Sequence, residues 1–354
     1  MGQLNVLITG IAGYIGSYTA KQCVESGWKV IGVDNFSTGL RTRIRWGECE
    51  TGDAGDVKLI RRLLRRNEIS VVIHLAGSAH VAESLQRPTW YVANNCSVTG
   101  RLLRAMRDEG VPNIVFASSC AIYGSLNDGI AAEDSCASPL SPYGDSKLLA
   151  ERHLCRCHRA YGLNWISLRY FNVAGVEPGS ELGEDPIHTT RAIPRAISAA
   201  LRIQGPFPLF GTDYAGADGT AVRDYVHVAD VARANIAAAR YLTTCDGPSV
   251  NTVNIGSGQA HSIREVLSAV ARISGEEVPV VYMGRRVGES ARVVADASRA
   301  LAVLGWQPKC SSLDYLVQST FAWQSRSQPK EIGNRGIGQN ENLREMPESR
   351  LQAR

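Results

Sequence analysis

The 354-residue sequence predicts an α/β protein, built as a doubly wound parallel sheet followed by a smaller mixed α/β lobe. Three observations lead to this prediction. Strand-like and helix-like stretches alternate through the first half, a glycine-rich turn follows the first strand, and the alternation breaks after residue 172. With 44% hydrophobic and 20% charged residues the composition is that of a globular protein, and the length is too great for one ordinary core.

The first half of the chain indicates a series of βα units. Strands are expected at residues 5–9, 29–33, 71–75, 113–118 and 165–170, and helices at residues 14–26, 57–66, 91–109 and 142–161. The stretch at 71–75 is almost continuously apolar, which is typical of a parallel strand covered on both faces. Strands joined in this way predict one parallel sheet with helices on both sides.

The second half indicates a smaller lobe fed by crossovers from the first. Residues 175–190 are rich in glycine, proline and acids and predict a long functional loop. Helices are expected at residues 192–203, 228–242, 263–274 and 313–324, and short strands near 208–210, 252–255 and 278–282. We therefore divide the chain into a first domain at 1–175, a lobe at 176–325 and a polar tail at 326–354, for which we predict disorder.

Charge and cysteine content exclude several classes of protein. The net charge of +4 is small and spread along the chain, so no nucleic-acid partner is expected. No apolar run reaches the roughly 18 residues of a membrane span, and the N-terminus lacks the pattern of a secretory signal. Nine cysteines without a C-x-x-C pair indicate free thiols in a reducing cytoplasm and no metal site.

A phosphate-binding turn is predicted directly after the first strand. Val6-Leu7-Ile8-Thr9 leads into Gly10-x-x-Gly13-x-x-Gly16, and a helix follows. Gly10 permits the tight turn, Gly13 lets a pyrophosphate approach the backbone, and Gly16 lets helix and strand pack closely. Asp34 ends the second strand, where an acid accepts ribose hydroxyls and repels a 2′-phosphate. Residues 1–175 are thus predicted to be a Rossmann-type domain that binds NAD, and the glycine spacing resembles the extended short-chain dehydrogenases/reductases.

Ser119, Tyr143 and Lys147 form the predicted catalytic set. Tyr143 and Lys147 are four residues apart on a predicted helix and so share one face. Ser119 follows an apolar strand, at the edge of the sheet where open α/β sheets place their ligands. Each feature alone has an ordinary structural explanation, but the three in this order behind a dinucleotide loop indicate an active site.

The chemistry requires a phenol of unusual acidity. Tyrosine has a reference pKa near 10, so a base poised near 7 needs about 4 kcal/mol of stabilisation of its phenolate. An ammonium about 5 Å away supplies about 3 kcal/mol at an effective dielectric constant near 20. We expect Lys147 to lower the pKa of Tyr143 and to hold the nicotinamide ribose, Tyr143 to take a hydroxyl proton, and Ser119 to position the alcohol.

Motifs along residues 4–325 closely resemble the UDP-glucose 4-epimerases. They are Gly-Tyr-Ile-Gly-Ser (13–17), Asp34-Asn35, Gly52-Asp53, His74-Leu75-Ala76, Asn94-Asn95, Ser118-Ser119, Ser141-Pro-Tyr143-Gly-x-Ser-Lys147, Arg169-Tyr-Phe-Asn172, Phe210-Gly-x-Asp-Tyr, Val222-Arg223-Asp-Tyr, Arg285-Arg286-x-Gly-Glu289 and Ala295-Asp296. Together they are far more specific than the glycine loop.

The resemblance implies a set of binding residues. For NAD the implied residues are Gly10, Gly13, Tyr14, Ile15, Gly16, Asp34, Asn35, Asp53, Ala54, Leu75, Ala76, Asn95, Tyr143, Lys147 and Phe171. For the UDP-sugar they are Ser119, Tyr143, Asn172, Ala192, Phe210, Arg223, Arg286, Glu289 and Val293. Arg223 and Arg286 would clamp the pyrophosphate, because a planar guanidinium matches phosphate oxygens.

The resemblance also implies a reaction that is redox-neutral overall. Hydride leaves sugar C4, the 4-keto sugar turns about its phosphate bond, and hydride returns to the other face, so that UDP-glucose and UDP-galactose interconvert. NAD should remain bound throughout, since release of NADH would strand the intermediate. A homodimer formed through residues 91–109 and 142–161 is also implied.

Three departures from the family pattern leave the identity of the preferred UDP-sugar undecided. Ala79 stands where many members have Lys. Arg191 stands where Asn or His is usual, and its charge could meet a sugar carboxylate. Val293 stands where some members have Tyr, which leaves room for an N-acetyl group. The alternatives are therefore 4-epimerases of UDP-GlcNAc/GalNAc, UDP-glucuronate or UDP-xylose/arabinose and, less well supported because the catalytic set is intact, a non-catalytic NAD-sensing regulator.

Overall fold

The computed structural model describes residues 3–177, 179–180, 182–184, 189–216, 218–244 and 252–326. The predicted tail beyond residue 326, and parts of the predicted loop at 175–190, lie outside these residues. Within the described ranges, no helix combines the length and the apolar character that crossing a membrane requires.

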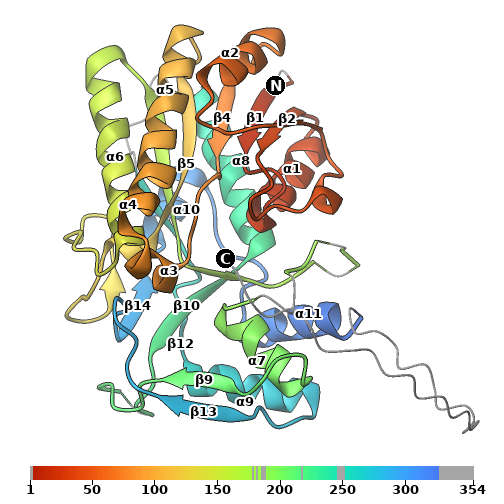
Figure 1. Ribbon diagram of the computed structural model, residues 1–354, viewed down its shortest axis with the longest axis vertical. Helices are drawn as coiled ribbons and strands as arrows, with labels where there is room; N and C mark the ends of the chain where they lie inside the picture. Colours follow the sequence, from red (N-terminus) through yellow and green to blue (C-terminus); the bar gives the residue numbers. More distant parts are fainter. Residues whose placement is uncertain are drawn as a thin grey trace, which may run out of the picture.

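A seven-stranded parallel sheet forms the centre of the first lobe, which consists of this sheet and the helices on its two faces and is called the first layer below (Figure 1). Its order is β11-β7-β5-β4-β1-β2-β3, and every neighbouring pair is parallel. The strands are β1 (Asn5–Thr9), β2 (Lys29–Asp34), β3 (Glu48–Thr51), β4 (Val71–His74), β5 (Asn113–Ser119), β7 (Asn164–Tyr170) and β11 (Thr252–Ile255). The order reverses direction at β1, which places a ligand crevice beyond its carboxyl end.

Helices cover both faces of this sheet, because its strands are apolar on both sides. One face is covered by α1 (Tyr14–Glu25), α8 (Val228–Thr244) and α10 (Ser298–Leu304), and the other by α2 (Val57–Arg66), α5 (Val98–Asp108) and α6 (Pro142–Tyr161). Along β1, Val6 and Ile8 pack toward the first group, whereas Leu7 packs toward the second. The predicted Rossmann-type doubly wound fold is confirmed.

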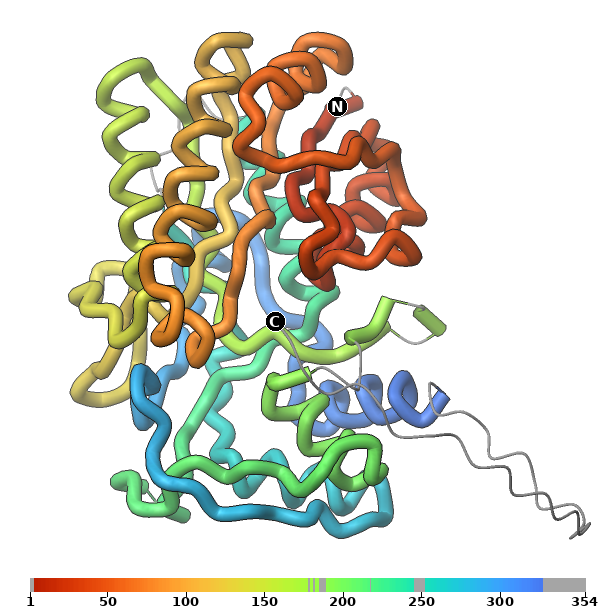
Figure 2. Tube along the Cα trace, viewed as in Figure 1, coloured from red at the N-terminus to blue at the C-terminus, as the bar shows by residue number. Residues whose placement is uncertain are grey.

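The second lobe lies at the carboxyl edge of the large sheet (Figures 1 and 2). Its sheet has the order β12-β10-β14-β6, with β8 paired to β10, and a separate ribbon joins β13 to β9. The strands are β6 (Ile130–Ala131), β8 (Asn172–Ala174), β9 (Phe207–Phe210), β10 (Val222–His227), β12 (Ala260–Ser262), β13 (Val280–Met283) and β14 (Arg292–Ala295). Helices α7 (Ala192–Ala200), α9 (Ile263–Ser274) and α11 (Leu313–Arg326) pack around one apolar core with the ribbon.

Short helical elements complete the chain before α6. They are α3 (Val81–Gln86), α4 (Pro88–Tyr91), a π-helical segment (Val92–Ser97) and single 3₁₀ turns at Arg41–Arg43 and Cys120–Ile122. The prediction of one regular helix over residues 91–109 is therefore wrong in detail, because a wide π turn separates α4 from α5. Such wide turns are frequent at functional sites, and this one contains Asn95.

Several strands of the second lobe were not predicted. Of β6, β8, β10, β12 and β14, none stands out as an isolated apolar run in the sequence, and each is held by partners distant in the chain. Conversely, α8 and β11 come from the second half of the chain but pack in the first layer. These are the expected crossovers.

Candidate active site

The glycine loop joins β1 to α1 in a conformation that other residues cannot adopt. Gly10 has φ +75°, and a Cβ on it would lie 2.8 Å from the backbone nitrogen of Ala76. A Cβ on Gly16 would lie 2.1 Å from the carbonyl oxygen of Gly10. Gly13 would meet only that same oxygen, at 3.2 Å, so its other side is free of protein atoms within 4 Å. This pattern agrees with the three roles predicted for the glycines.

The N-terminus of α1 is available to an anion. Gly13 is its N-cap, no side chain caps it, and its first turn contains no acid. The first N–H groups of a helix have no partner within the helix, and the helix dipole adds positive potential there. These features fit the pyrophosphate of a dinucleotide.

Asp34 is fixed beside the glycine loop. Its carboxylate accepts hydrogen bonds from the backbone nitrogens of Ala12 at 2.9 Å and Phe36 at 2.8 Å. Gly39 approaches so closely that a Cβ on it would lie 2.9 Å from this carboxylate. The acid therefore has one orientation, at the end of β2 where an adenosine ribose would be held.

The other residues predicted for NAD lie along the same edge of the sheet. Asp53 accepts a hydrogen bond from the Gly55 nitrogen at 2.7 Å, and the Asn35 amide lies 3.4 Å from it. Leu75 and Ala76 are held to Thr9 through their backbone nitrogens. The remaining members are Tyr14, Ala54, Asn95 and Phe171, which are buried, and Ile15, which is half-buried.

Tyr143 and Ser119 come together at the carboxyl edge of β5. Ser119 is the last residue of β5, and Tyr143 is in the first turn of α6, which begins at the N-cap Ser141. Burial raises the pKa of Tyr143, and the neighbouring Ser119 side chain acts to lower it. Both are buried, and the ring of Tyr91 meets the Tyr143 ring edge-on with centroids 6.4 Å apart.

Lys147 is buried on α6, one turn after Tyr143. Its ammonium donates a hydrogen bond to the Ala117 carbonyl at 2.8 Å and lies 5.0 Å from the centre of the Phe116 ring. Burial lowers the pKa of Lys147 to about 8 and raises the pKa of Tyr143 to about 12. In the protein without a bound cofactor, desolvation of the buried phenolate outweighs the effects of Ser119 and Arg191, which act to lower the pKa of Tyr143. The lowering expected with a bound nicotinamide stays a prediction.

Two buried networks that the sequence did not reveal hold this catalytic helix. Asn95 donates to Ser146 Oγ at 2.9 Å, and Ser146 donates in turn to the Tyr143 carbonyl at 2.7 Å. One turn beyond Lys147, Glu151 forms an ion pair of 2.8 Å with Arg169 of β7. Asn95 and Arg169 stood in recognised motifs, but nothing in the sequence indicated these partners.

Four predicted substrate residues form one cluster in the second lobe. Glu289 pairs with Arg286 at 2.9 Å and with Arg223 at 3.4 Å, and the Arg286 guanidinium lies 3.9 Å from the centre of the Phe210 ring. This loop adjoins the start of α6, since a Cβ on Gly288 would lie 3.5 Å from Cβ of Ser141. Arg286 and Glu289 flank Gly288, and Arg223 pairs with Glu289, so both arginines belong to the segment that approaches α6. Guanidinium groups in such a position can hold a diphosphate.

Of the remaining predicted residues, two lie on strands of the second lobe and one begins a helix. Asn172 begins β8 and pairs with Tyr225 in β10, and Val293 in β14 pairs with Arg223. Val293 is 7% exposed and packs in a small core with Phe171. Ala192 is the first residue of α7 and is half-buried.

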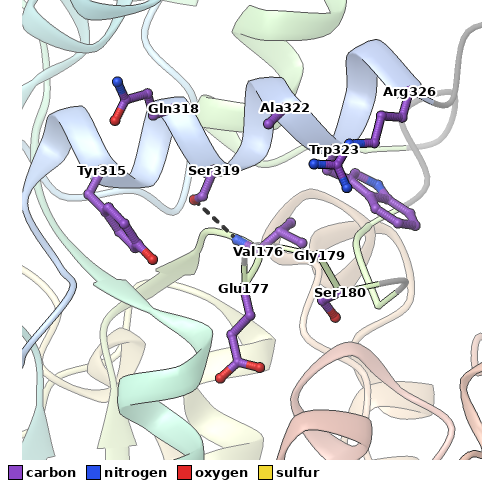
Figure 3. A pocket seen from close by; sticks show the side chains of 10 residues that line it. All are labelled: Val176, Glu177, Gly179, Ser180, Tyr315, Gln318, Ser319, Ala322, Trp323 and Arg326. Carbon is purple, nitrogen blue, oxygen red and sulfur yellow. Dashed lines mark hydrogen bonds between the residues drawn. The ribbon is translucent and has the colours of Figure 1, made fainter.

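A separate cavity of about 180 Å³ lies between the loop after β8 and α11 (Figure 3). Val176 at its floor donates a backbone hydrogen bond to Ser319 of α11 at 3.3 Å. Tyr315 and Trp323 line it on the helix side. None of the residues predicted for NAD or the UDP-sugar lines this cavity, so it is distinct from the candidate active site.

Fold and site together define a dinucleotide-binding protein with a Ser-Tyr-Lys set at the carboxyl edge of its sheet. Residues 6–256 match the NAD dependent epimerase/dehydratase family. The chain belongs to this family.

Its relatives include the UDP-glucose 4-epimerase of Azospirillum brasilense, which is 38% identical over 332 residues, or 94% of each chain. The crystal structure of UDP-glucose 4-epimerase from Brucella ovis in complex with NAD superimposes with a TM-score of 0.86 at 38% identity, covering 90% of this chain and 98% of that one. The enzyme from Bifidobacterium longum in complex with NAD⁺ and UDP gives the same score at 33% identity, covering 91% and 98%.

Proposed function

We propose that this protein is an NAD-dependent 4-epimerase that interconverts UDP-glucose and UDP-galactose. The observation that carries the proposal is the pair of buried side chains of Ser119 and Tyr143, which lie at the sheet edge that carries the dinucleotide loop and adjoin the loop of Arg286 and Glu289. The similarity to UDP-glucose 4-epimerases over nearly the whole chain supports this substrate.

The cofactor fits the residues that are present. The glycine loop, the open N-terminus of α1 and the fixed carboxylate of Asp34 would hold the pyrophosphate and the adenosine ribose. When bound, NAD supplies the acceptor and donor of hydride and a positive ring beside the phenol. Lys147 and Asn95, at the end of this edge, would then orient the nicotinamide half.

In the proposed reaction, Tyr143 removes the proton of the C4 hydroxyl and later returns it. Ser119 accepts a hydrogen bond from the sugar and keeps the phenol aligned with it. A base of this kind works best when its pKa is near the operating pH, so binding must lower the pKa of Tyr143 from about 12. Lys147 and the oxidised ring would add to the positive charge of Arg191, which already acts to lower this pKa.

The sugar must turn over between the two half-reactions while its nucleotide stays in place. Arg223 and Arg286 would hold the diphosphate, Phe210 would contact the uracil, and Asn172 would bond to the diphosphate-sugar. Glu289 holds both arginines in the protein and would bind a ribose hydroxyl. The nucleotide would be held by charge-assisted contacts and the sugar by few contacts, so the 4-keto ring would be able to rotate.

The test is a coupled assay of the purified protein on UDP-galactose together with an absorbance scan for bound dinucleotide. The proposal predicts formation of UDP-glucose without added NAD and a dinucleotide that remains with the protein on gel filtration. A chain that holds no dinucleotide, or that holds it and turns over no UDP-sugar, contradicts the proposal.

The small side chain of Val293 supports a wider range of sugars. Val293 belongs to one small apolar core with Phe171 and pairs with Arg223 in the neighbouring strand, and the family resemblance implies that a larger residue here would lie beside the sugar. We propose that UDP-GlcNAc is also epimerised. If UDP-glucose turns over well and UDP-GlcNAc not at all, this part of the proposal is wrong.

We further propose a homodimer that works in the cytoplasm. Leu149 and Tyr161 on α6, together with Trp90 in α4, are large apolar side chains exposed on the outer helices of the first layer. The eight cysteines within the described residues are all unpaired, as in proteins of reducing compartments. Sedimentation of the purified protein and of its Leu149→Asp variant tests the dimer. We expect the unchanged protein to sediment as a dimer and the variant as a monomer.

A further inference from the structure

Tyr91 is a buried tyrosine beside the catalytic set, and the proposed reaction does not use it. It is the last residue of α4, and its side chain is fully buried. Its ring lies edge-on to the ring of Tyr143, with the centroids 6.4 Å apart and the ring planes at 81°. This is a favoured arrangement of two aromatic rings. Tyr91 therefore supports, from a neighbouring helix, the side chain that is to act as the base.

The Tyr91 ring is itself held in one orientation. Its hydroxyl donates a hydrogen bond to the Glu83 carboxylate at 2.8 Å and accepts one from the backbone nitrogen of His80 at 3.2 Å. Glu83 lies in α3 and accepts a further hydrogen bond from Arg87 at 3.0 Å. A side chain that is packed along its ring and bonded at its end can hold a reactive group in place.

Tyr91 is not a second base. Its hydroxyl already donates to Glu83, and burial, together with this hydrogen bond, raises the pKa of Tyr91 above that of an ordinary tyrosine. The phenol therefore keeps its proton at neutral pH and remains a donor. The bond between Tyr91 and Glu83 persists under the conditions in which Tyr143 is to give up its proton.

The backbone and the ring of Tyr143 are held by different neighbours. Ser146 donates to the Tyr143 carbonyl at 2.7 Å, and Asn95 donates to Ser146, so the first turn of α6 is fixed. These bonds do not by themselves set the side-chain torsions of Tyr143. Tyr91 contacts the ring, which carries the reacting oxygen. A displacement of about 1 Å at a reacting atom can cost roughly a hundredfold in rate.

We propose that Tyr91 is a positioning residue, whose tethered ring fixes the orientation of the Tyr143 ring and so places the Tyr143 hydroxyl for proton transfer at C4. The inference rests on the proposed 4-epimerase function. It gives a role to the two short helices before the π-helical segment, because α3 supplies the tether at Glu83 and α4 supplies the ring.

The test compares kcat and KM for UDP-glucose in the wild-type protein, Tyr91→Leu and Tyr91→Phe, and measures bound dinucleotide in each. Tyr91→Leu removes the ring and should lower kcat about tenfold or more, because the base loses its alignment. Its KM and dinucleotide content should stay near normal, since Tyr91 belongs to neither predicted binding set. Tyr91→Phe should keep most of the kcat, because the edge-to-face contact remains.

Leu154→Ala is the matched control for a general loss of packing. Leu154 is fully buried further along α6 and belongs to the apolar core beneath that helix. Its truncation should lower the melting temperature and leave kcat unchanged. Should Tyr91→Leu not fold, Tyr91→Met takes its place, since an unbranched side chain fills the space without a flat ring. The same loss of kcat is expected.

Three kinetic results overturn the inference. In the first, the variant without the ring has a near-normal kcat. In the second, Tyr91→Phe loses as much as Tyr91→Leu, which would assign the effect to the hydroxyl. In the third, Leu154→Ala loses as much as Tyr91→Leu, which would assign it to packing in general.

A wild-type protein that turns over no UDP-sugar refutes the proposed function, and crystal structures then decide the inference. It predicts one orientation of the Tyr143 ring in the wild-type protein and more than one in Tyr91→Leu. The same single orientation in both structures would show that Tyr91 does not position the ring.

Discussion

The dinucleotide half and the sugar-nucleotide half hold their functional groups in different ways. Around the glycine loop the backbone itself forms the site: Gly16 has no room for a side chain, and Asp34 is fixed by two backbone nitrogens. In the second lobe, the partly buried side chains of Arg223 and Arg286 are held by Glu289. The first half is complete before any ligand binds, whereas the second must exchange internal ion pairs for ligand. This difference suits a cofactor that stays and a substrate that leaves.

Tyr143, at the junction of the two halves, gives the largest expected effect. Tyr143→Phe removes the base and should lower kcat by about a thousandfold or more while the dinucleotide stays bound. Steady-state assays with measurement of bound dinucleotide check this. Tyr161→Phe, which alters an exposed tyrosine on the same helix, should be near normal. Near-normal activity of Tyr143→Phe would refute the assignment.

Gly16→Ala tests the dinucleotide half, where the backbone forms the binding site before any ligand is present. The new Cβ would lie 2.1 Å from the Gly10 carbonyl, so the turn must move and its anion site is lost. We expect the purified variant to contain little dinucleotide and to melt at a lower temperature. Gly205→Ala is the control, because a Cβ there meets nothing within 4 Å. Full retention of dinucleotide by Gly16→Ala would mean that the turn is less constrained than described.

Arg286→Gln tests the sugar-nucleotide half, where internal ion pairs must give way to the substrate. Loss of one charge-assisted contact to the diphosphate should raise KM for UDP-glucose about tenfold or more and leave dinucleotide content unchanged. Its neighbour Arg285 pairs with Asp213 at the surface, so Arg285→Gln should have a normal KM. Equal KM values for the two variants would remove Arg286 from the substrate site.

The buried Lys147 gives a smaller, pH-dependent effect on stability. Its pKa is about 8 in the folded protein against 10.5 for an ordinary lysine, so between these values the unfolded chain binds more protons. The free energy of unfolding should therefore gain up to about 3 kcal/mol from Lys147 as pH rises through this window. Denaturant titrations at several pH values should show this gain lost in Lys147→Met.

Lys58→Met, which removes an exposed lysine from α2, is the control for that series. It should show the same pH dependence as the wild-type protein. Parallel curves for Lys147→Met and wild type would contradict the depressed pKa.

What the sequence could predict depended on whether the signal was local. Strand β1, the glycine turn and α6 were predictable because apolar runs, glycine spacing and the Tyr143–Lys147 interval are short-range features. The pairing of β10 with β8 and β14 was not, because it joins residues about 50 to 70 positions apart in short, partly polar strands.

The same reason applies to the site. Tyr143 and Ser119 were identified as members of motifs, but the direction of the Tyr143 pKa shift depends on burial, which three-dimensional packing decides. The two ion pairs of Glu289, with Arg223 and with Arg286, were not predictable either, because they form only where β10 lies next to the loop before β14.

The central claim is that hydrogen leaves C4 and returns to C4 of the same sugar while the dinucleotide stays bound. UDP-glucose labelled with deuterium at C4 tests it directly. The account predicts that UDP-galactose formed in ordinary water retains the label in full, as measured by mass spectrometry. Loss of the label to solvent would contradict the account.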